Sequence, residues 1–490
     1  MSKPTIDFPL VLQDGATGLQ SAVYDAVRRA ILEGRIEAGA RLPATRDLSE
    51  QLGVARGTVV SAYEQLVAEG YLSGQRGAGT FVSDALPDRW FSPRRKATIS
   101  RKPRGATLST RGAALARARF PVALPGAPRP FLPYTPAVDL FPRARWGQLV
   151  ARHARVRHAA RFRDLDARGY RPLREALAEH LRVFRGVRCD AEQVLVLAGV
   201  HQALDLVARM LLDRGESVWL EDPGYFGARR VLHAAELDVV PVPVDDSGLD
   251  VERGIAAAPH ARLVYVTPAH QAPLGSTLSL DRRMRLLDWA DRSGAWIFED
   301  DYDSEFRYEG RPLAALQALD DRDVVIHAGT LSKVMFPGLR LAYLVVPEAL
   351  VDPFTAGMSM LHRYVPLVPQ AAAADFIAEG DLGRHVRRAR NVYGERRASM
   401  MSALSSEIGD RLDVAGTTCG MQVLARLTNR TSDRAVCRSA YDAGLEVLPL
   451  SKFAIRPLRR GGLVLGFAAV EASRTRRAVG LLRQVLATFR

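Results

Sequence analysis

The sequence has little cysteine. Only three of its 490 residues are cysteines, and Cys189, Cys419 and Cys437 lie far apart without a Cys-x-x-Cys spacing. An odd number of distant thiols excludes a disulfide scaffold and a cysteine-based zinc site. Reduced thiols are typical of the cytosol, so we expect a cytoplasmic protein.

The sequence also lacks long apolar runs and internal repeats. No stretch of 18 apolar residues occurs, so a membrane-spanning helix is not expected. The first 15 residues contain Asp7 and two prolines, which does not fit a signal peptide. Apolar residues make up 47% and charged residues 25% of the chain, which excludes global disorder, collagen and coiled coils. The length predicts about two to four domains.

Positive charge is concentrated in one part of the chain. The net charge is +14, and residues 86–135 alone hold 11 basic residues against one aspartate. Such an excess suggests an acidic partner such as nucleic acid. The stretch is rich in proline and arginine, and residues 86–125 are predicted to be a linker between modules 1–85 and 126–490. The linker is either a solvated spacer or an aid to gripping phosphates.

The N-terminal module has the pattern of a winged helix-turn-helix. Apolar periodicity predicts helices over 18–34, 47–52 and 56–69, with a tight turn at 53–55. A short hairpin with a glycine-rich tip follows over 71–82. This order of elements is typical of the largely helical, all-α class of winged helix-turn-helix domains.

The residues of this module suit DNA. The third helix begins with short side chains and free N–H groups, which can approach a groove and its phosphates. Glycines at the hairpin tip permit close approach to a sugar-phosphate edge. The alternative is a helical protein-interaction module. The candidate DNA-binding residues are Arg46, Arg56, Gly57, Thr58, Arg76 and Gly77.

Four segments resemble the GntR family of bacterial winged-helix repressors. These are Gly34-Arg35-Ile36, Gly39 to Leu48, Gly53 to Val59 and Glu69 to Leu72. The resemblance implies that the candidate residues above contact an operator. Ala55 departs from the family, which usually has serine there, and so removes a helix N-cap at a cost of about 1 kcal/mol.

The linker bears on DNA affinity because the N-terminal module is slightly acidic. Residues 1–85 hold 8 basic and 10 acidic residues, whereas affinity falls with salt at a slope of about −0.9 per phosphate neutralised. We expect the linker to supply part of the attraction and dimerisation the rest. Neutralising the six basic residues between 94 and 104 should therefore flatten the salt dependence of operator binding. An unchanged slope would refute this role.

From about residue 190 the large module alternates β-branched runs with helical stretches. Seven such runs predict a largely parallel sheet covered on both faces. Ligands bind such sheets at the carboxyl ends of the strands. The runs are Val194–Leu197, Ser217–Leu220, Asp238–Val244, Leu263–Thr267, Ala295–Phe298, Val324–Ala328 and Leu341–Val346.

Chemically useful residues follow these runs. Gly199 makes a strand-to-helix turn after the first run, and the N–H groups there suit a phosphate. The fifth run leads into Asp300 and Tyr302, which point the same way because strand side chains alternate. The sixth run leads to Lys333, with Arg340 beyond it. One cofactor uses all of these groups together, namely pyridoxal 5′-phosphate.

Each residue has a role with this cofactor. Lys333 would form the Schiff base, and Asp300 would keep the pyridine nitrogen protonated. Tyr302 would donate to the ring hydroxyl, and Tyr225 would stack on the ring. Taken singly, each residue also has a structural explanation, such as a cap or an ion pair. The predicted phosphate cup is Gly199, Val200, His201, Thr330, Ser332 and Arg340.

The surrounding motifs resemble fold-type-I aminotransferases, and with the N-terminal module they resemble the MocR-type subfamily of GntR regulators. The motifs are Asp222 to Tyr225, Thr267 to Gln271, Glu299 to Tyr308 and Gly329 to Arg340. The resemblance implies an α/β, PLP-dependent transferase fold with a seven-stranded, mostly parallel sheet and a small C-terminal α+β subdomain. It adds His270 to the cofactor residues. It also implies a cytoplasmic, head-to-tail homodimer in which the cofactor is an effector or a sensor of an amine or amino acid.

Several positions depart from these families. Ala198 removes one phosphate-binding hydroxyl, and Phe226 stands where proline is common. Ala272 and Leu274 replace bulkier or hydroxyl-bearing residues. Val464 stands where aminotransferases place the arginine that binds the substrate carboxylate. This departure argues against efficient amino-acid transamination, or for an effector without an α-carboxylate. The replacement donor would have to be Arg456, Arg459 or Arg460.

The sequence therefore predicts a PLP-dependent transcriptional regulator rather than an enzyme. It would bind an operator as a dimer and sense PLP, an amine or an amino acid through aldimine chemistry at Lys333. One alternative is an active aminotransferase with an accessory DNA-binding domain, against which Val464 weighs. The other is a DNA-binding protein whose large domain only dimerises, against which the joint presence of Asp300, Tyr302, Lys333 and Arg340 weighs.

Overall fold

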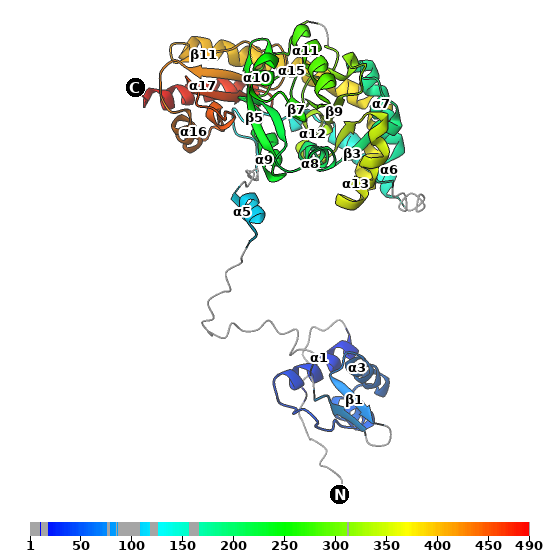
Figure 1. Ribbon diagram of the computed structural model, residues 1–490. Coiled ribbons are helices and arrows are strands. Elements are labelled where there is room, and N and C mark those ends of the chain that lie inside the picture. Colours follow the sequence, from blue (N-terminus) through cyan, green and yellow to red (C-terminus); the bar gives the residue numbers. More distant parts are fainter. Residues whose placement is uncertain are drawn as a thin grey trace. The chain divides into compact units, whose positions relative to one another are not determined.

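The computed structural model describes residues 10, 18–75, 79–84, 86, 108–117, 126–155, 166–310 and 313–489. The chain divides into two compact units, Met1–Thr107 and Leu108–Arg490 (Figure 1). Among the described residues, no helix is long and apolar enough to cross a membrane. Most of the predicted linker lies outside the described residues.

The N-terminal unit consists of three helices and a hairpin. Its elements are α1 (Leu19–Leu32), α2 (Thr45–Leu52), α3 (Arg56–Ala68), β1 (Leu72–Gln75) and β2 (Gly79–Val82).

The core of this unit joins the apolar faces of its helices. Val27 of α1, Leu48 of α2 and Leu66 of α3 are at most 1% exposed and pack together. Gly53 ends α2 with a φ of 66°, a left-handed conformation that permits the tight turn into α3. The winged helix-turn-helix is therefore confirmed, with the second helix beginning two residues earlier than predicted.

The C-terminal unit is built on an eight-stranded sheet. Its order is β3-β10-β9-β8-β7-β4-β5-β6. The strands are β3 (Val194–Leu197), β4 (Ser217–Asp222), β5 (Asp238–Asp245), β6 (Gly248–Leu249), β7 (Leu263–Val266), β8 (Trp296–Asp301), β9 (Val325–Thr330) and β10 (Ala342–Val345).

The sheet confirms the mostly parallel prediction. Strands β5, β4, β7, β8 and β9 pair in parallel, and β10 is antiparallel to both β3 and β9. All seven predicted runs form strands. The eighth strand, β6, was not predicted because it is only two residues long and pairs antiparallel with β5.

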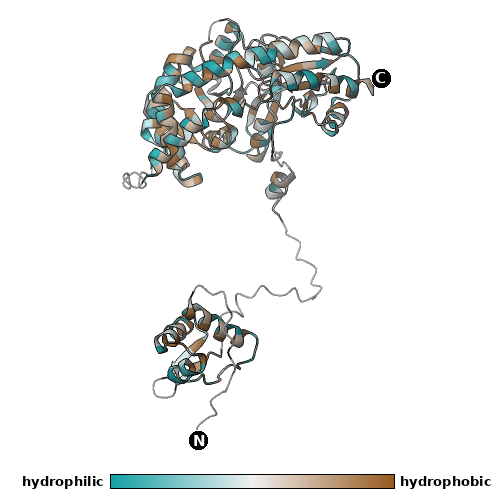
Figure 2. Ribbon diagram, turned by 180° about the vertical axis from the view of Figure 1, so that it is seen from behind, coloured by the Kyte–Doolittle hydropathy of each residue, from teal (hydrophilic) through white to brown (hydrophobic). Residues whose placement is uncertain are grey.

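Helices cover both faces of this sheet (Figure 1). They carry hydrophilic as well as hydrophobic residues, as amphipathic helices do (Figure 2). The helices of this unit are α6 (Arg143–Ala154), α7 (Arg171–Arg185), α8 (Val200–Leu211), α9 (Phe226–Ala234), α10 (Val251–Ala257), α11 (Leu280–Ser293), α12 (Leu331–Val334), α13 (Val351–Leu361), α14 (Leu367–Ala378), α15 (Asp381–Ile408), α16 (Asp433–Asp442) and α17 (Ala472–Ala487).

The two faces have separate apolar cores. Leu263 and Tyr265 of β7 pack with α8 and α13, whereas Val264 and Val266 pack with α10 and α11. This alternation is the period-two pattern of a strand buried on both sides. The carboxyl ends of the parallel strands remain the edge at which the predicted site residues should meet.

A smaller antiparallel sheet completes the unit. Its order is β11-β12-β14-β13, formed by Leu412–Val414, Gln422–Leu427, Gly462–Gly466 and Leu448–Pro449. Helices α15, α16 and α17 pack against it, which is the predicted C-terminal α+β subdomain.

One part of the predicted linker is helical. Helix α5 (Thr110–Arg117) contains no proline and contacts α9 of the same unit. The Arg111 guanidinium pairs with the Glu236 carboxylate at 3.2 Å, just beyond the end of α9. The linker prediction had found no helical periodicity here, because eight residues are too few to display one against a proline- and arginine-rich background.

Candidate functional site

Lys333 lies directly after the sixth strand of the predicted series. Strand β9 ends at Thr330, whose hydroxyl accepts a hydrogen bond from the Ser332 amide at 3.1 Å and caps α12. The Lys333 ammonium donates to the Tyr134 carbonyl at 2.6 Å. Burial lowers the pKa of Lys333 to about 8, against the opposing charges of Asp303 and Asp300. A lysine with such a pKa is partly neutral near pH 8 and can act as a nucleophile.

Strand β8 ends in three consecutive buried carboxylates, and two of them have cationic partners. Glu299 pairs with His327 at 3.0 Å, and Asp301 pairs with Arg185 at 2.6 Å. Asp300 points to the other side of the strand because side chains alternate. Among the described residues it has no ion-pair partner.

Asp300 is left with an unsatisfied oxygen. Its Oδ2 accepts a hydrogen bond from the Tyr265 phenol, while its buried Oδ1 has no partner among the described residues. Burial raises the pKa of Asp300 to about 7. A buried carboxylate without a cation is unfavourable, so a ligand that presents a positively charged N–H would suit this position.

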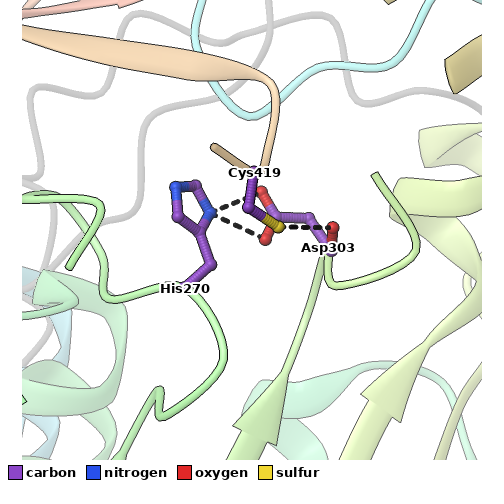
Figure 3. A group of neighbouring side chains, drawn as sticks. All are labelled: His270, Asp303 and Cys419. Carbon is purple, nitrogen blue, oxygen red and sulfur yellow. Dashed lines mark hydrogen bonds and ion pairs between the residues drawn. The ribbon is translucent and has the colours of Figure 1, made fainter. Parts of the chain in front are cut away.

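Tyr302 is held by a buried network, part of which is drawn in Figure 3. Its phenol oxygen lies 3.0 Å from His270 Nδ1 and accepts from the Gln422 amide at 3.2 Å. His270 Nδ1 is also 2.9 Å from the Asp303 carboxylate. Because a carboxylate is a strong acceptor, we assign a proton to His270 Nδ1 and infer that this N–H donates to Asp303. The Tyr302 hydroxyl is then free to donate to a ligand.

The same network raises the question of a metal. One ligand atom each from His270, Asp303 and Cys419 lies within 4.8 Å of the others (Figure 3). However, burial and Asp303 raise the pKa of the Cys419 thiol well above its ordinary value, which opposes the thiolate that a metal requires. The imidazole and the carboxylate already satisfy each other. We therefore interpret this group as the support of Tyr302.

The predicted phosphate cup is formed at the start of α8. A Cβ at Gly199 would lie 2.7 Å from the Arg340 guanidinium, so the glycine lets this guanidinium approach the start of α8 closely. Val200 and His201 form the first turn of α8, whose N–H groups are available to an anion. The Ser332 hydroxyl is buried and has no partner among the described residues. The structure thus brings Gly199 and Arg340 together, and the role of these groups in holding a phosphate stays a prediction.

Thr330 and Tyr225 also have partners of their own. Besides capping α12, the Thr330 hydroxyl donates to the Leu341 carbonyl at 3.3 Å, so it is less available to a phosphate than predicted. Tyr225 is the N-cap residue of α9, and its phenol lies 2.8 Å from His201 Nε2. This contact joins the predicted stacking residue to the cup.

The donor set fits pyridoxal 5′-phosphate. Asp300 has the free acceptor for a pyridinium N–H, Tyr302 the free hydroxyl, Lys333 the amine, and the Gly199–Arg340 cradle the room and charge for a phosphate. When bound, this cofactor supplies an aldehyde for amines and an electron-withdrawing ring. The residues present would hold and orient it, and Asp300 would keep its ring nitrogen protonated.

Val464 lies in an apolar cluster beside the site. It is fully buried on β14 and packs with Phe226, Leu424, Leu450 and Phe453. Two cations lie near this cluster, Lys452 and Arg230, which are 4.3 and 5.5 Å from the centre of the Phe226 ring. Val464, which stands where aminotransferases place the carboxylate-binding arginine, therefore has mainly apolar neighbours.

The three arginines considered as replacement carboxylate donors lie elsewhere. Arg459 and Arg460 border a cavity of about 430 Å³ together with Thr428, Asn429 and Arg430. Lys333 and Tyr134 do not line it. The backbone N–H of Arg456 donates to the Asp222 carboxylate at 3.1 Å, and its side chain is exposed.

Sequence reasoning missed four residues of the site. Tyr134 comes from a segment 199 positions before Lys333, and its contribution is a backbone carbonyl, which no side-chain motif can reveal. Tyr265 and Gln422 are polar residues within apolar strands, and this pattern could have identified them as site residues from the sequence. Asp303 lies within the motif from Glu299 to Tyr308, but no role was predicted for it.

In the N-terminal unit, the candidate DNA-binding residues lie at the starts of α2 and α3. Arg46 is exposed and pairs only with Glu50 at 3.4 Å, an interaction of little strength at a surface. Arg56 and Gly57 are exposed, and Thr58 is half-buried. Arg56 has no hydrogen bond or ion pair within the described part of the chain. The predicted contacts Arg76 and Gly77 lie outside the described residues.

Replacing Arg56 with alanine should weaken operator binding about 10- to 100-fold per half-site if it contacts a base, because a good base contact is worth about 1–3 kcal/mol. The measurement is fluorescence anisotropy with a duplex that the protein selects from random-sequence DNA. Arg35→Ala is the matched control, since Arg35 follows α1 and pairs with Glu33 at 2.6 Å. Equal affinities of the two variants would contradict the assignment of α3.

Comparisons with known proteins agree with both units. Residues 148–482 match the family model of aminotransferase class I and II, and residues 19–82 match that of the bacterial regulatory proteins of the gntR family. The chain is 38% identical to the probable rhizopine catabolism regulatory protein MocR of Rhizobium meliloti, over 96% of this chain and 94% of that protein. It is 32% identical to the pyridoxine biosynthesis regulator PdxR of Corynebacterium glutamicum, over 94% and 95% of the two chains.

A solved structure is similar to the large unit. It is the α-aminoadipate aminotransferase LysN of Thermus thermophilus, in complex with N-(5′-phosphopyridoxyl)-L-leucine. The TM-score is 0.67 at 28% identity, and the match covers 73% of this chain and 92% of that one.

Proposed function

Since the chain belongs to the MocR-type regulators of the GntR family, with PLP as the cofactor of its aminotransferase-like domain, we propose that it regulates transcription in response to PLP or an amine or amino acid that reacts at Lys333. One observation carries this proposal: a buried lysine of lowered pKa interacts electrostatically with Asp300, a carboxylate with one oxygen that has no partner among the described residues, in a chain whose other unit is a helix-turn-helix. Operator binding places this activity in the cytoplasm.

The proposed chemical event is an exchange of amines. With the cofactor bound, Lys333 Nζ would hold its aldehyde carbon, and the nitrogen of an effector amine could replace Lys333 there. One C=N bond would replace another, and the effector nitrogen would give up the proton that Lys333 gains, so no oxidant would be needed. Asp300 would face the ring nitrogen, and Tyr302 would direct its hydroxyl at the ring. The released Lys333 can again donate to the Tyr134 carbonyl, which lies 2.6 Å away.

Helix α9 offers a route from this event toward the DNA-binding unit. Its N-cap residue is Tyr225, the proposed stacking residue, and just beyond its end Glu236 pairs with Arg111 of α5. Helix α5 stands at the end of the linker that leads to the other unit. A ligand that favours one position of α9 would therefore bias the linker, which requires different affinities for the two positions.

We place the protein in a head-to-tail homodimer. Large apolar side chains remain exposed on the C-terminal unit, among them Met360 (81%), Leu280 (65%) and Val183 (63%). Met360 is followed by the exposed Leu361 (45%) and Tyr364 (39%), and neighbouring exposed apolar groups are typical of association surfaces. A dimer would also present two recognition helices to a palindromic operator. Sedimentation equilibrium tests this state.

The test of the function is operator affinity with and without small molecules. A duplex selected from random-sequence DNA is titrated with the PLP-loaded protein, alone and with 2-phenylethylamine, leucine or excess PLP. We expect at least one addition to change the affinity by about fivefold or more, the lower range of allosteric coupling. An affinity that no amine, amino acid or PLP changes, across a panel of such compounds, would overturn the sensing role.

An active aminotransferase is the second candidate, favoured by the similarity to LysN. The Schiff-base lysine and the ring partners would serve such an enzyme equally well. The discriminating measurement is the keto acid formed from an amino donor with 2-oxoglutarate as acceptor. Product well beyond one equivalent per site would support the enzyme, and product that stops at one equivalent would support the regulator.

A further inference from the structure

The apolar cluster around Val464 reaches the reactive lysine. Val464 of β14 stands opposite Leu424 of β12, and both are at most 3% exposed. Two residues earlier on the same strand, and therefore on the same face, Gln422 holds the Tyr302 hydroxyl. This face of the small sheet thus passes from Gln422, the partner of Tyr302, to the aliphatic and aromatic side chains packed around Val464.

Aromatic rings connect this patch to Lys333. The ring of Tyr134 lies 6.1 Å from that of Phe453 and 5.8 Å from Lys333 Nζ. Phe453 in turn lies 5.3 Å from Phe226, which follows the proposed stacking residue Tyr225. The side chains next to the lysine on this side are therefore aromatic or aliphatic.

A carboxylate bound here would lose its hydration without gaining a partner. Charged groups are buried in proteins only when paired and hydrogen-bonded, and a carboxylate is best held by a bidentate guanidinium. The cluster of described residues around Val464 offers apolar contact instead. An effector that places a carboxylate on the amine-bearing carbon is consequently disfavoured, whereas an uncharged substituent gains from burial.

We propose that the effector is a primary amine whose amine-bearing carbon carries an apolar or uncharged group and no carboxylate. This inference rests on the proposed function, because it concerns the ligand that reacts at Lys333. It gives the effector class of the site as decarboxylated amines rather than α-amino acids. Reactions that remove the carboxyl group of amino acids, or that release free amines from larger molecules, would supply such a ligand.

Two cations near the cluster must be included in the test. Lys452 Nζ lies 4.3 Å and the Arg230 guanidinium 5.5 Å from the centre of the Phe226 ring. Burial and Arg230 lower the pKa of Lys452, which weakens it as a partner for an anion. If a carboxylate does bind at this side of the site, Lys452 is the group that would hold it.

The experiment titrates the PLP-loaded protein with matched pairs of ligands and follows its visible absorption. The pairs are 2-phenylethylamine against phenylalanine and isoamylamine against leucine, which differ only in the carboxylate. We expect each amine to bind about 10- to 100-fold more tightly than its amino acid, the range of one charge-assisted interaction. Tighter binding of the amino acids would overturn the inference.

Variants at position 464 test whether Val464 causes the preference for amines over amino acids. Val464→Arg should gain affinity for phenylalanine and lose affinity for 2-phenylethylamine, while Val464→Leu, the control of similar character, should keep the wild-type preference. The wild-type comparison stands even if Val464→Arg does not fold. Amino-acid binding that disappears in Lys452→Gln would assign the carboxylate to Lys452 and contradict the proposal.

The two levels of the proposal fail differently. A protein that takes up PLP without a visible band that borohydride abolishes would refute the chemistry at Lys333, and with it the proposed function. A protein with that band that prefers amino acids refutes only the effector class.

Discussion

Lys333→Ala is expected to abolish the visible band of the PLP-loaded protein and every response of operator binding to amines. Its Nζ is the amine that the site presents, buried beside Asp300 and held by the Tyr134 carbonyl. The measurement is the absorption spectrum before and after borohydride, followed by operator titration with and without 2-phenylethylamine. Affinity for DNA in the absence of effector should stay within a few-fold of wild type, because the helix-turn-helix belongs to the other unit.

The composition of the chain sharpens this experiment. The sequence contains only five lysines, Lys3, Lys96, Lys102, Lys333 and Lys452. Lys452→Ala is the matched control, since this residue is also partly buried and has a lowered pKa. The borohydride-reduced adduct should be found by mass spectrometry on the peptide with Lys333 alone. A band that survives in Lys333→Ala, or an adduct on Lys452, would contradict the assignment.

Glu299→Gln is expected to lower the free energy of unfolding by about 3–5 kcal/mol, the cost of breaking a buried ion pair by removing one partner. Glu299 is fully buried, pairs with His327 and accepts the backbone N–H groups of Leu316 and Gln317 at 2.7 and 3.0 Å. A glutamine offers one acceptor instead of two and no charge. Denaturant unfolding of the protein without cofactor measures the loss.

The pH dependence of this loss follows from the pKa shifts of the pair. Despite burial, His327 and the backbone donors lower the pKa of Glu299 to about 2, so its contribution is present above pH 4.5 and is lost as the pH falls toward 2. The pKa of buried His327 is raised by Glu299, so its contribution is present below pH 6.5 and is lost as the pH rises through the raised value. The difference between wild type and Glu299→Gln should therefore be largest between about pH 4.5 and 6.5.

The neighbouring residue supplies the control. Asp300→Asn alters a carboxylate that lacks a cationic partner among the described residues, so it should cost little stability without cofactor and should instead weaken PLP binding. Equal destabilisation by the two variants would mean that Glu299 has no special structural role.

The location of the cofactor site could be predicted from the sequence because of one geometric rule. Parallel strands end at the same edge of a sheet, so residues after separate apolar runs converge there. That rule brings Asp300, Tyr302 and Lys333 to one site, and the free Oδ1 of Asp300 fits its predicted role. From the sequence alone, the alternation of strand side chains also predicts that Asp300 lies on the opposite side of the strand from Glu299 and Asp301.

Other features depend on contacts that no local pattern records. The carbonyl of Tyr134 and the amide of Gln422 reach the site from distant segments. The use of the Thr330 hydroxyl as a cap follows from the turn that β9 makes into α12. Helix α5 is stabilised by α9 and by Glu236 rather than by its own sequence, since eight-residue helices are marginal alone.

The contact between α5 and α9 also indicates how large a movement a bound ligand could cause at the end of α9. Helix α9 has nine residues and so is about 13 Å long. If its first turn is displaced by a ligand and the helix tilts as a rigid rod by about 10°, its far end moves by about 2 Å, comparable with the helix shifts that separate regulatory states. A change of ångström size at the ring of a small molecule would in that case reach, undiminished, the point where Glu236 pairs with Arg111.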